Sequence, residues 1–510
     1  MTFVSDTRRF LAARAGDWQD PCCLARSFLT EEHLHYDDES PDPPARTAGY
    51  TLRKWRGEYY AWQEGVYRRV SDETVRVRVT RWLQDNQPMA RMATGSDVRI
   101  TRTLLSNVLL NMDPMILIRE SFELNAWLDD SDRPPAIAVG NGLLLFDGEG
   151  TSPADPTGPG LVLRPHTPNY FTLARLPFDY DPEARCPAWR RFLAEATCGR
   201  ADLAILLQQW VGYLFRHDLG QQKFLLCVGE GANGKGVFFE VVQRLVGRDN
   251  CSQVPLARFA NPFALAATVG KLVNATNESS GLIDPEAEAL LKAFVAGDRF
   301  TFERKYREPV SATPTAKVMI ATNALPRFTD KTQGLWRRVL LVPFDRIVDE
   351  EDQDRDLAGR IATTELPGVF LWAMEGLRLL NRHGFTVPEV SRTMLEEHRR
   401  DVDPAREFLL SNYAASEEYE GLPAAEVYDA YCRFCEANGC RPTNAANFGR
   451  QVRRTFPTVE KARRREGRAV VSIYQGLAVL EDSEVAGDRL GSVRSARGAR
   501  GNFLFVEQTG

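Results

Sequence analysis

The sequence predicts an α/β protein whose central part carries the chemistry. Three observations support this fold class. Residues 221–346 alternate short apolar runs, typical of buried parallel strands, with helical segments. One such run, Phe224–Val228, is followed directly by a glycine-rich loop and an amphipathic helix. After residue 404, two amphipathic segments precede a basic β-hairpin, which is the pattern of a winged helix.

The composition excludes several classes of protein. With 510 residues at roughly 150 per domain, the chain corresponds to about three domains. Hydrophobic residues make up 43% and charged residues 26%, which excludes a disordered chain and a coiled-coil rod. No apolar run approaches the ~20 residues of a membrane span, and none follows the N-terminal arginines as in a secretory signal. Nine cysteines without framework spacing favour a reducing compartment, so we expect the cytoplasm of a bacterium or the interior of a host cell.

These patterns divide the chain into six parts. The predicted parts are an N-terminal extension with an acidic linker (1–49), an α+β region (50–215), the phosphate-loop core (216–350), a helical lid (351–403), the winged helix (404–482) and a flexible tail (483–510). In the α+β region, aromatic residues alternate with arginine and glycine at Trp55, Tyr59, Tyr60, Trp62 and Tyr67. This alternation predicts the core of a β-hairpin, with stacking on nucleic-acid bases as the alternative.

The glycine-rich loop has the form G-x-x-x-x-G-K between a strand and a helix. Glycines allow the backbone to fold around an anion, and the helix N-terminus adds its dipole. The lysine of this pattern reaches the β- and γ-phosphates of a nucleotide. We therefore expect ATP to bind at Gly229, Glu230, Gly231, Ala232, Asn233, Gly234, Lys235, Gly236 and Val237.

Three polar residues follow or precede further buried-strand runs. Glu278 ends the run from Leu272 and is placed to act on Mg²⁺ and the attacking water, with a surface glutamate as the alternative. Asn323 ends the run from Val318 and fits a contact with the γ-phosphate, although such an asparagine is usually a turn residue. Arg338 precedes the strand from Val339 and fits an arginine finger on an oligomer face, with a structural ion pair as the alternative.

The segment from Phe300 to Pro309 predicts a β-hairpin with a basic tip. Apolar and polar residues alternate before a cluster that contains Lys305 and Arg307. Basic groups held on a hairpin suit contact with a phosphodiester backbone without reading its sequence. A solvated hairpin edge protected by charge is the alternative.

Taken in order, these stretches resemble superfamily III helicases, and among them the phage and plasmid replicative helicases related to poxvirus helicase–primases. The resemblance covers roughly residues 50–480. It is carried by GEGANGKGVF (229–238), LVNATNES (272–279), LLKAFVAGDRFTFERKYREP (290–309), KVMIATNALP (317–326) and LWRRVLLVPF (335–344). NGLLLFDG (141–148), PFDYDP (177–182) and WVGYLFRHDLGQQKFLLCVGEG (210–231) resemble the helicase-associated domain that precedes the ATPase in that family.

The resemblance implies an AAA+-like P-loop ATPase that works as a ring around DNA, and the expected ring is a hexamer. Lys235 would bind ATP, Glu278 would be the catalytic carboxylate and a Mg²⁺ ligand, and Asn323 would be the sensor. Arg338 would be the finger that acts on the neighbouring subunit, with Arg337 as the second choice. Lys305 and Arg307 would grip one DNA strand.

Two departures from the family pattern concern the metal. Gly236 stands where a serine or threonine normally ligates Mg²⁺, and Asn277 stands where many relatives carry a second acid. Asp130 and Asp132 lie in a Ser/Pro loop without a supporting histidine and predict a turn rather than a two-metal site. We therefore expect no primase activity in this chain and a separate primase or polymerase as partner.

The last folded part is basic, although the whole chain has a net charge of −5 from 64 basic and 69 acidic residues. Residues 441–470 contain nine Lys or Arg and two Asp or Glu, a local excess of +7. This excess predicts a DNA-binding face at Arg450, Arg453, Arg454, Arg463, Arg464 and Arg465. A protein-docking winged helix is the alternative. Cys432, Cys435 and Cys440 lack a fourth ligand and predict core packing rather than zinc.

The function predicted from these elements is an ATP-dependent replicative DNA helicase of a phage, plasmid or integrated element. It would use ATP and Mg²⁺ and move on single-stranded or forked DNA as a ring of identical subunits, away from membranes. Two alternatives remain: a DNA translocase that does not separate strands, and an initiator scaffold that binds ATP and DNA but barely hydrolyses. The scaffold is suggested by Gly236.

Overall fold

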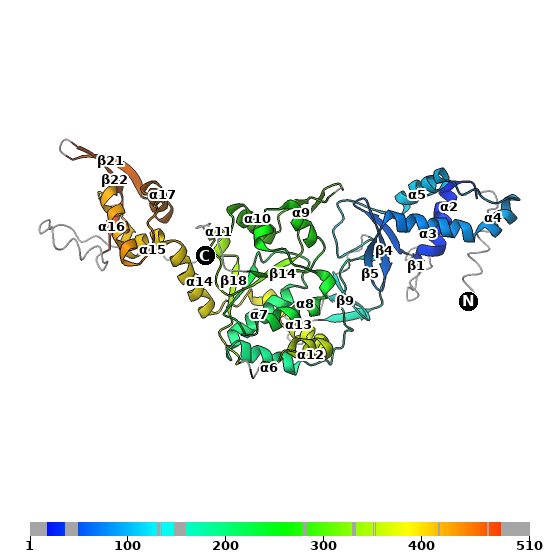
Figure 1. Cartoon of the computed structure of the whole chain (residues 1–510), viewed down its shortest axis with the longest axis horizontal. Coiled ribbons are helices and arrows are strands. Elements are labelled where there is room, and N and C mark those ends of the chain that lie inside the picture. The colour runs from blue at the N-terminus through cyan, green and yellow to red at the C-terminus, as the bar shows by residue number, and fades with distance from the viewer. Residues whose placement is uncertain are drawn as a thin grey trace. The chain divides into compact units, whose positions relative to one another are not determined.

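The computed structural model divides into two compact units, residues 1–391 and residues 392–510 (Figure 1). The residues that the structure describes are 18–35, 49–129, 133, 135–146, 160–278, 283–305, 307–328, 333–349, 351, 353–416, 419–466 and 469–480. The predicted flexible tail (483–510), most of the N-terminal extension, and Asp130 and Asp132 lie outside them. None of the described helices is both long enough and apolar enough to cross a membrane.

The first unit begins with helices packed on a small sheet of order β5-β4-β3-β6. Its elements are α2 (Pro21–His33), β1 (Leu34–His35), β2 (Gly49–Tyr50), β3 (Leu52–Trp55), β4 (Glu58–Gln63), β5 (Val66–Val70), α3 (Asp72–Asp85), α4 (Gln87–Thr94), α5 (Arg102–Ile116) and β6 (Leu117–Ile118). Ser71 and Thr101 cap α3 and α5 by accepting hydrogen bonds from first-turn amides.

Helix α2 differs from the prediction that residues 1–49 form a peripheral extension. Phe28 and Leu29 of α2 are buried in one core with Trp82 of α3 and Met112 of α5. The acidic and proline-rich residues that follow this segment led to the prediction of a linker, although the segment itself has an apolar helical face. Residues 21–33 are therefore part of the folded N-terminal region.

The aromatic alternation forms the predicted hairpins, because β3 pairs with β4 and β4 with β5, both antiparallel. The rings of Trp55, Tyr59, Tyr60 and Tyr67 are buried. Trp55 and Tyr60 pack edge to face against Phe171. The aromatic residues therefore build a core, and base stacking on these four rings is excluded.

A three-stranded sheet of order β10-β9-β8 and a helical layer come next. The elements are β7 (Ala126–Trp127), β8 (Ala136–Val139), β9 (Gly142–Phe146), β10 (Leu161–Arg164), β11 (Tyr170–Phe171), α6 (Pro187–Ala196) and α7 (Ala201–Tyr213). Helix α7 packs closely on α13 (Leu366–His383), and a Cβ at Gly212 would overlap the backbone of Ala373. Glycine at this position allows the two helix backbones to approach.

The centre of the first unit is a five-stranded parallel sheet of order β13-β14-β17-β12-β18. Its strands are β12 (Phe224–Val228), β13 (Cys251–Ser252), β14 (Val273–Glu278), β17 (Lys317–Thr322) and β18 (Val339–Pro343). The three neighbouring strands β12, β17 and β18 are buried and mostly apolar, and the predicted mixed α/β architecture with a parallel sheet is confirmed.

The elements between and after these strands are mostly helical (Figure 1). They are α8 (Lys235–Val246), η1 (Arg248–Asn250), η2 (Leu256–Arg258), α9 (Pro262–Leu265), η3 (Ala266–Thr268), α10 (Pro285–Ala296), β15 (Phe300–Phe302), β16 (Val310–Ala312), α11 (Gln333–Trp336), α12 (Leu357–Thr364) and α14 (Glu389–Val402). Val369 and Phe370 of α13 share the core of α7, α8 and the sheet. The first unit thus extends to Ser391, past the predicted start of the lid at residue 351.

The second unit contains helices and two small sheets around its own core. Its elements are α15 (Pro404–Asn412), β19 (Tyr413–Ala415), β20 (Leu422–Pro423), α16 (Ala424–Ala437), α17 (Ala445–Thr455), β21 (Glu460–Glu466), β22 (Ala469–Gln475) and β23 (Leu477–Val479). Tyr431 of α16 stacks on Phe448 of α17 with ring centroids 4.6 Å apart. Cys435 is fully buried in this core, as predicted, and no metal-holding cluster of three His, Cys, Asp or Glu occurs among the described residues.

Candidate nucleotide and nucleic-acid sites

The glycine-rich loop joins the carboxyl end of β12 to the start of α8. A Cβ at Gly229 would overlap the carbonyl of Phe344, so only glycine fits there. Gly234 has a φ of 91° and precedes the first residue of α8, where no side chain caps the helix. The first amides of a helix have no intrahelical acceptor, so the start of α8 offers N–H donors to an anion.

Asn233 fixes the shape of this loop. Its side-chain amide donates to the carbonyl oxygen of Phe344 at 2.9 Å, and it is 4% exposed. The amide of Val348 donates to the carbonyl oxygen of Ala232 at 3.0 Å. The segment after β18 therefore braces the loop, a role for Phe344 and Val348 that the sequence analysis missed.

Lys235, the first residue of α8, points its ammonium group into the loop. The Nζ atom donates to the carbonyl oxygens of Gly229 and of Glu230, the latter at 2.9 Å, and to Oδ1 of Asn233 at 3.1 Å. Burial lowers the pKa of Lys235 from its ordinary value. A phosphate group would replace neutral oxygens around this ammonium with charged ones, which strengthens the hydrogen bonds.

The two other polar residues of the predicted site lie along the same edge of the sheet. Thr322 is in register with Val228 on one side and with Glu278 on the other. Glu278 therefore ends β14 beside the end of β17, and Asn323 is the next residue after β17 and is exposed. The carboxyl ends of parallel strands are where ligands bind in α/β sheets. The side chain of Glu278 is not among those described, so its predicted role as metal ligand stays a prediction.

Gly236 leaves open space at the start of α8. A Cβ at this position would meet no atom within 4 Å. The missing hydroxyl is therefore not imposed by crowding within this chain.

Arg338 lies at the amino ends of the strands, and the glycine-rich loop lies at their carboxyl ends. Its carbonyl oxygen accepts a hydrogen bond at 2.9 Å from the amide of Phe224, the first residue of β12. Five strand residues separate this end from the glycine-rich loop, a distance of about 16 Å at ~3.3 Å per residue. The Arg338 guanidinium donates to the carbonyl oxygen of Gly334, and burial lowers the pKa of Arg338. Arg338 therefore cannot reach the loop of its own chain.

The predicted basic hairpin is present, with β15 and β16 paired antiparallel and Lys305 and Arg307 in the connecting loop. Lys305 is exposed. Arg307 instead forms an ion pair with Glu58 of β4, and Arg304 lies 3.0 Å from the same carboxylate. Glu58 is 249 residues from Arg307, and no local pattern in the sequence could have indicated this contact.

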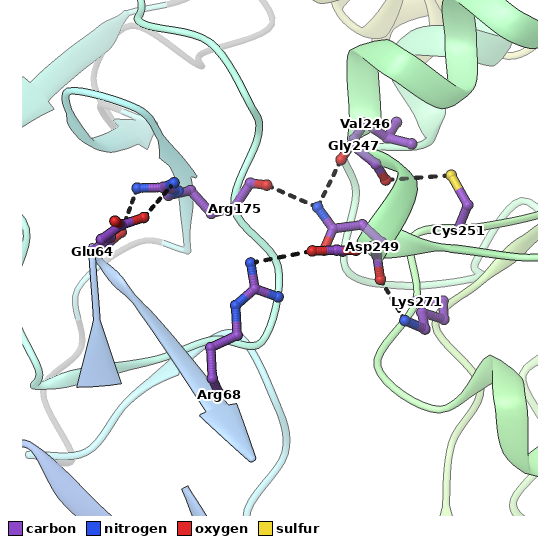
Figure 2. Close-up of polar contacts among 9 residues, drawn as sticks. Glu64, Arg68, Arg175, Val246, Gly247, Asp249, Cys251 and Lys271 are labelled. Atoms are coloured by element: carbon purple, nitrogen blue, oxygen red, sulfur yellow. Dashed lines mark hydrogen bonds and ion pairs between the residues drawn. The ribbon is translucent and has the colours of Figure 1, made fainter. Parts of the chain in front are cut away.

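The N-terminal sheet also contacts the core next to the end of α8 (Figure 2). Arg175 pairs with Glu64 at 3.0 Å through its side chain, and its carbonyl oxygen accepts from the side-chain amide of Asn250 at 2.8 Å. Arg68 of β5 lies 3.8 Å from Asp249. These contacts attach the β4–β5 hairpin to the segment that follows the phosphate-loop helix.

The arginines of the second unit that were predicted to contact DNA lie on helix α17 and on strand β21. Arg450, Arg453 and Arg454 are exposed on α17, at spacings that place them on one side of the helix. Arg463 and Arg465 are exposed on one face of β21, whereas Arg464 faces the other way and lies 3.6 Å from Glu420. Of the six arginines of the second unit that were predicted to contact DNA, five are therefore exposed. The sixth, Arg464, has its side chain on the other face of β21 from Arg463 and Arg465.

Three family models match parts of the chain. Residues 46–198 match "D5 N terminal like", residues 227–338 match a family of unknown function (DUF5906), and residues 403–479 match the RFX DNA-binding domain. The DUF5906 match spans the glycine-rich loop and ends at Arg338. The RFX match spans nearly all of the second unit's described elements.

Curated relatives match separate stretches. The "Putative helicase L207/L206" of Acanthamoeba polyphaga mimivirus is 21% identical over 277 residues, which is 47% of this chain and 28% of that protein. The mitochondrial protein ymf21 of Marchantia polymorpha is 32% identical over 108 residues, 19% of this chain and 60% of that protein. Human DNA-binding protein RFX5 is 52% identical over 48 residues, 9% of this chain and 8% of that protein. The chain thus spans less than two thirds of each of these relatives.

Among solved structures, the A form of the apo NrS-1 C-terminal region matches with a TM-score of 0.48 and 11% identity. It covers 90% of this chain and 100% of that chain. This chain is therefore similar in part to a D5-like N-terminal region and to a putative viral helicase, each over less than half of its length. The narrower assignment to superfamily III stays a prediction.

Proposed function

We propose that this chain is an ATP-dependent DNA helicase of a viral, phage or plasmid replication system, with a P-loop core. The observation that carries this proposal is the arrangement at the carboxyl edge of the parallel sheet. There, a glycine-rich loop, an uncapped helix start and the buried Lys235 lie beside the ends of the strands that carry Glu278 and Asn323. The mimivirus relative, named a helicase, supports the same class.

The donors of this edge fit a nucleoside triphosphate. In the proposal the first amides of α8 and Lys235 hold the β- and γ-phosphates, and Glu278 orients the attacking water. Glu278 would also hold Mg²⁺, which when bound neutralises charge on the phosphates. Asn323 would contact the γ-phosphate.

The position of Arg338 supports a ring. Since Arg338 is separated from its own loop by the length of β12, it can act only on ATP bound to another copy of the chain. A closed ring with head-to-tail contacts places this edge of one copy against the loop of the next. We propose a hexamer in which Arg338 neutralises transition-state charge across each interface, with Arg337 as the second choice.

The DNA contacts would come from both units. Lys305 and Arg307 of the β15–β16 hairpin would hold the backbone of a single strand. The second unit would act as a winged helix that binds duplex or forked DNA through α17 and the exposed face of β21, which its match to the RFX DNA-binding domain supports. A separate primase or polymerase would act as partner.

The proposal is tested by Lys235→Ala, because this ammonium is the positively charged group of the loop. We expect ATP hydrolysis to fall by about 10²-fold or more, and unwinding of a forked duplex to be lost with it. The matched control is Lys271→Ala, a lysine whose ammonium donates to the carbonyl oxygen of Asp249 away from the loop. Unchanged hydrolysis in Lys235→Ala would remove the nucleotide site from the proposal.

Gly236 favours a second function, an initiator scaffold that binds ATP and DNA but hydrolyses slowly. The helix start lacks the hydroxyl that normally ligates Mg²⁺. Hydrolysis measured with and without single-stranded DNA separates scaffold from motor, because DNA should accelerate only a motor. A forked-duplex assay then separates a helicase from a translocase that does not unwind.

A further inference from the structure

Three guanidinium groups converge on one carboxylate where the N-terminal sheet meets the basic hairpin. Oε1 of Glu58 lies 3.0 Å from Nη1 of Arg304 and also pairs with Arg307. Oε2 lies 3.3 Å from Nε of Arg69 and accepts a hydrogen bond from the Tyr60 hydroxyl at 3.3 Å. We call Glu58, Arg69, Arg304 and Arg307 the Glu58 cluster.

The Glu58 cluster is positively charged and partly open to solvent. Three positive charges and one negative charge leave an excess of two. The side chain of Glu58 is 13% exposed, whereas Arg307 and Arg69 are 43% and 48% exposed. Burial, and the nearby charge of Arg69, lower the pKa of Arg304. Nε and Nη2 of Arg304 also donate to the carbonyl oxygen of Glu308, which carries no charge. The excess of positive charge therefore remains and presents a surface for further anions.

The two sides of the Glu58 cluster differ in how firmly they are held. Glu58 lies on β4, which pairs with β3 and β5 and is attached to the core through Glu64 and Arg68 (Figure 2). Arg304 and Arg307 lie between β15 and β16, which pair only with each other among the strands that the structure describes. Phe300 packs edge to face against Phe294 of α10, and Phe302 is buried, so the core holds the strands of the hairpin. The ion pairs to Glu58 therefore bear on the position of the loop that joins these strands.

We propose that Glu58 is an internal competitor for the phosphates of single-stranded DNA, and that Arg69, Arg304 and Arg307 form the surface that the strand occupies when it displaces Glu58. This inference rests on the proposed function, because it assumes that the hairpin binds DNA. It extends the DNA path to the N-terminal sheet. It also makes Glu58 a latch that holds the hairpin until a strand arrives.

The chemistry of the cluster fits a phosphodiester backbone. A phosphodiester carries one negative charge and accepts paired hydrogen bonds from a guanidinium, as a carboxylate does. A strand offers such groups repeatedly, so it can contact Lys305 and Arg69 as well as the arginines that leave Glu58. The phosphates of a bound strand therefore displace the single carboxylate of Glu58 from the arginines.

The test compares two variants of the full chain that remove the same charge. Glu58→Gln removes the competitor, and Glu64→Gln removes a carboxylate of the adjoining β4–β5 turn that pairs with Arg175 instead of the hairpin. Binding of a fluorescent (dT)30 is measured against salt concentration. We expect Glu58→Gln to bind about 3- to 10-fold more tightly than wild type at low salt, and Glu64→Gln to match wild type.

The salt dependence gives a second readout that a merely structural role would not change. Free Glu58→Gln carries one more net positive charge than wild type, and this charge holds counterions that a bound strand would release. The slope of log K against log salt should therefore steepen by about 0.7. The gain in affinity should disappear when Arg304→Ala and Arg307→Ala are added. If Glu58→Gln unfolds, Glu58→Ala should show the same gain.

Two outcomes overturn the inference, and they are distinguishable. If wild type binds (dT)30 and Glu58→Gln binds no more tightly than Glu64→Gln, the latch is wrong and the proposed function stands. If wild type fails to bind (dT)30 with or without ATP, the proposed function fails, and the latch fails with it.

Discussion

At the scale of single residues, backbone geometry and burial decide which side chains can act. Gly234 is held at φ 91° with its missing Cβ 3.1 Å from the ring of Phe192. Gly236, two residues on, lies in open space. The two glycines therefore differ: Gly234 is required by the turn, and Gly236 is not required by packing.

Gly234→Ala should disturb the loop for this reason. A Cβ at positive φ costs about 1–2 kcal/mol, and the ring of Phe192 must also move. We expect a lower thermal unfolding temperature and weaker ATP binding, measured by calorimetry and by fluorescent-nucleotide titration. A variant as stable as wild type that binds ATP equally well would contradict the role assigned to this turn.

Gly236→Ser tests the missing hydroxyl. The new side chain meets no atom, and replacing glycine in a helix should raise the free energy of unfolding by up to about 0.5 kcal/mol. If the hydroxyl limits metal binding, hydrolysis should reach half its maximum at a lower Mg²⁺ concentration. Gly236→Ala is the control, since it adds a Cβ without a ligand. Equal Mg²⁺ dependence in both variants would show that the hydroxyl is not limiting.

Lys317 gives the first unit a dependence on pH. It starts β17, is 1% exposed, and donates to the carbonyl oxygen of Arg216. Burial lowers the pKa of Lys317 to about 7. Between pH 7 and the ordinary lysine pKa, the unfolded chain holds the proton more than the folded chain does. Stability should therefore rise with pH over this window.

Lys317→Met removes this titration at similar volume. Between pH 7 and 9, the thermal unfolding temperature of wild type should rise relative to that of Lys317→Met. Differential scanning calorimetry at the two pH values measures this difference. Parallel changes in the two proteins would show that Lys317 does not titrate in this range.

At the scale of elements, short basic segments present the candidate DNA contacts. The β15–β16 hairpin carries Lys305 and Arg307 on a loop between strands of three residues each. In the second unit, alternation along β21 turns Arg463 and Arg465 to one side and Arg464 to the other. The periodicity of the element therefore decides which charges can act together.

Replacing both hairpin residues, Lys305→Ala with Arg307→Ala, should remove the stimulation of ATP hydrolysis by single-stranded DNA. The reason is that the strand loses two charged contacts at the hairpin that is proposed to hold its backbone. Hydrolysis is measured over a series of (dT)30 concentrations. Stimulation equal to that of wild type would refute the hairpin assignment.

Replacing Arg463 and Arg465 with alanine should weaken duplex binding across all sequences and reduce the salt slope by about 1 per residue. Arg464→Ala is the matched control, since its side chain lies near Glu420. Filter binding of a random duplex at several salt concentrations measures both quantities. An equal effect of Arg464→Ala would mean that the faces of β21 do not matter.

Elements with a strong local pattern could be predicted from the sequence, and contacts between distant elements could not. The buried strand Phe224–Val228 and the basic hairpin have apolar runs and alternation that fix their type. Helix α2 was missed because its apolar face is followed by acidic and proline-rich text. The contact of Glu58 with the hairpin was missed because Arg304 and Arg307 follow roughly 250 residues later, and only the folded chain brings them together.

At the scale of the whole molecule, the residues proposed to act on ATP lie at opposite ends of the strands of one parallel sheet. Lys235, Glu278 and Asn323 lie at the carboxyl ends of the strands, whereas Arg338 lies at their amino ends beside Phe224. A single copy therefore cannot assemble the complete proposed site. The central claim is that ATP is hydrolysed between neighbouring copies.

Mixing two inactive variants tests this claim most directly. Lys235→Ala lacks the phosphate lysine and Arg338→Ala lacks the finger, so each alone should be inactive. In mixed rings, Lys235 of an Arg338→Ala subunit meets Arg338 of a Lys235→Ala subunit at about a quarter of the interfaces. We predict that an equal mixture regains about a quarter of wild-type hydrolysis when ATP and single-stranded DNA are present. A mixture as inactive as its two components would contradict hydrolysis between copies.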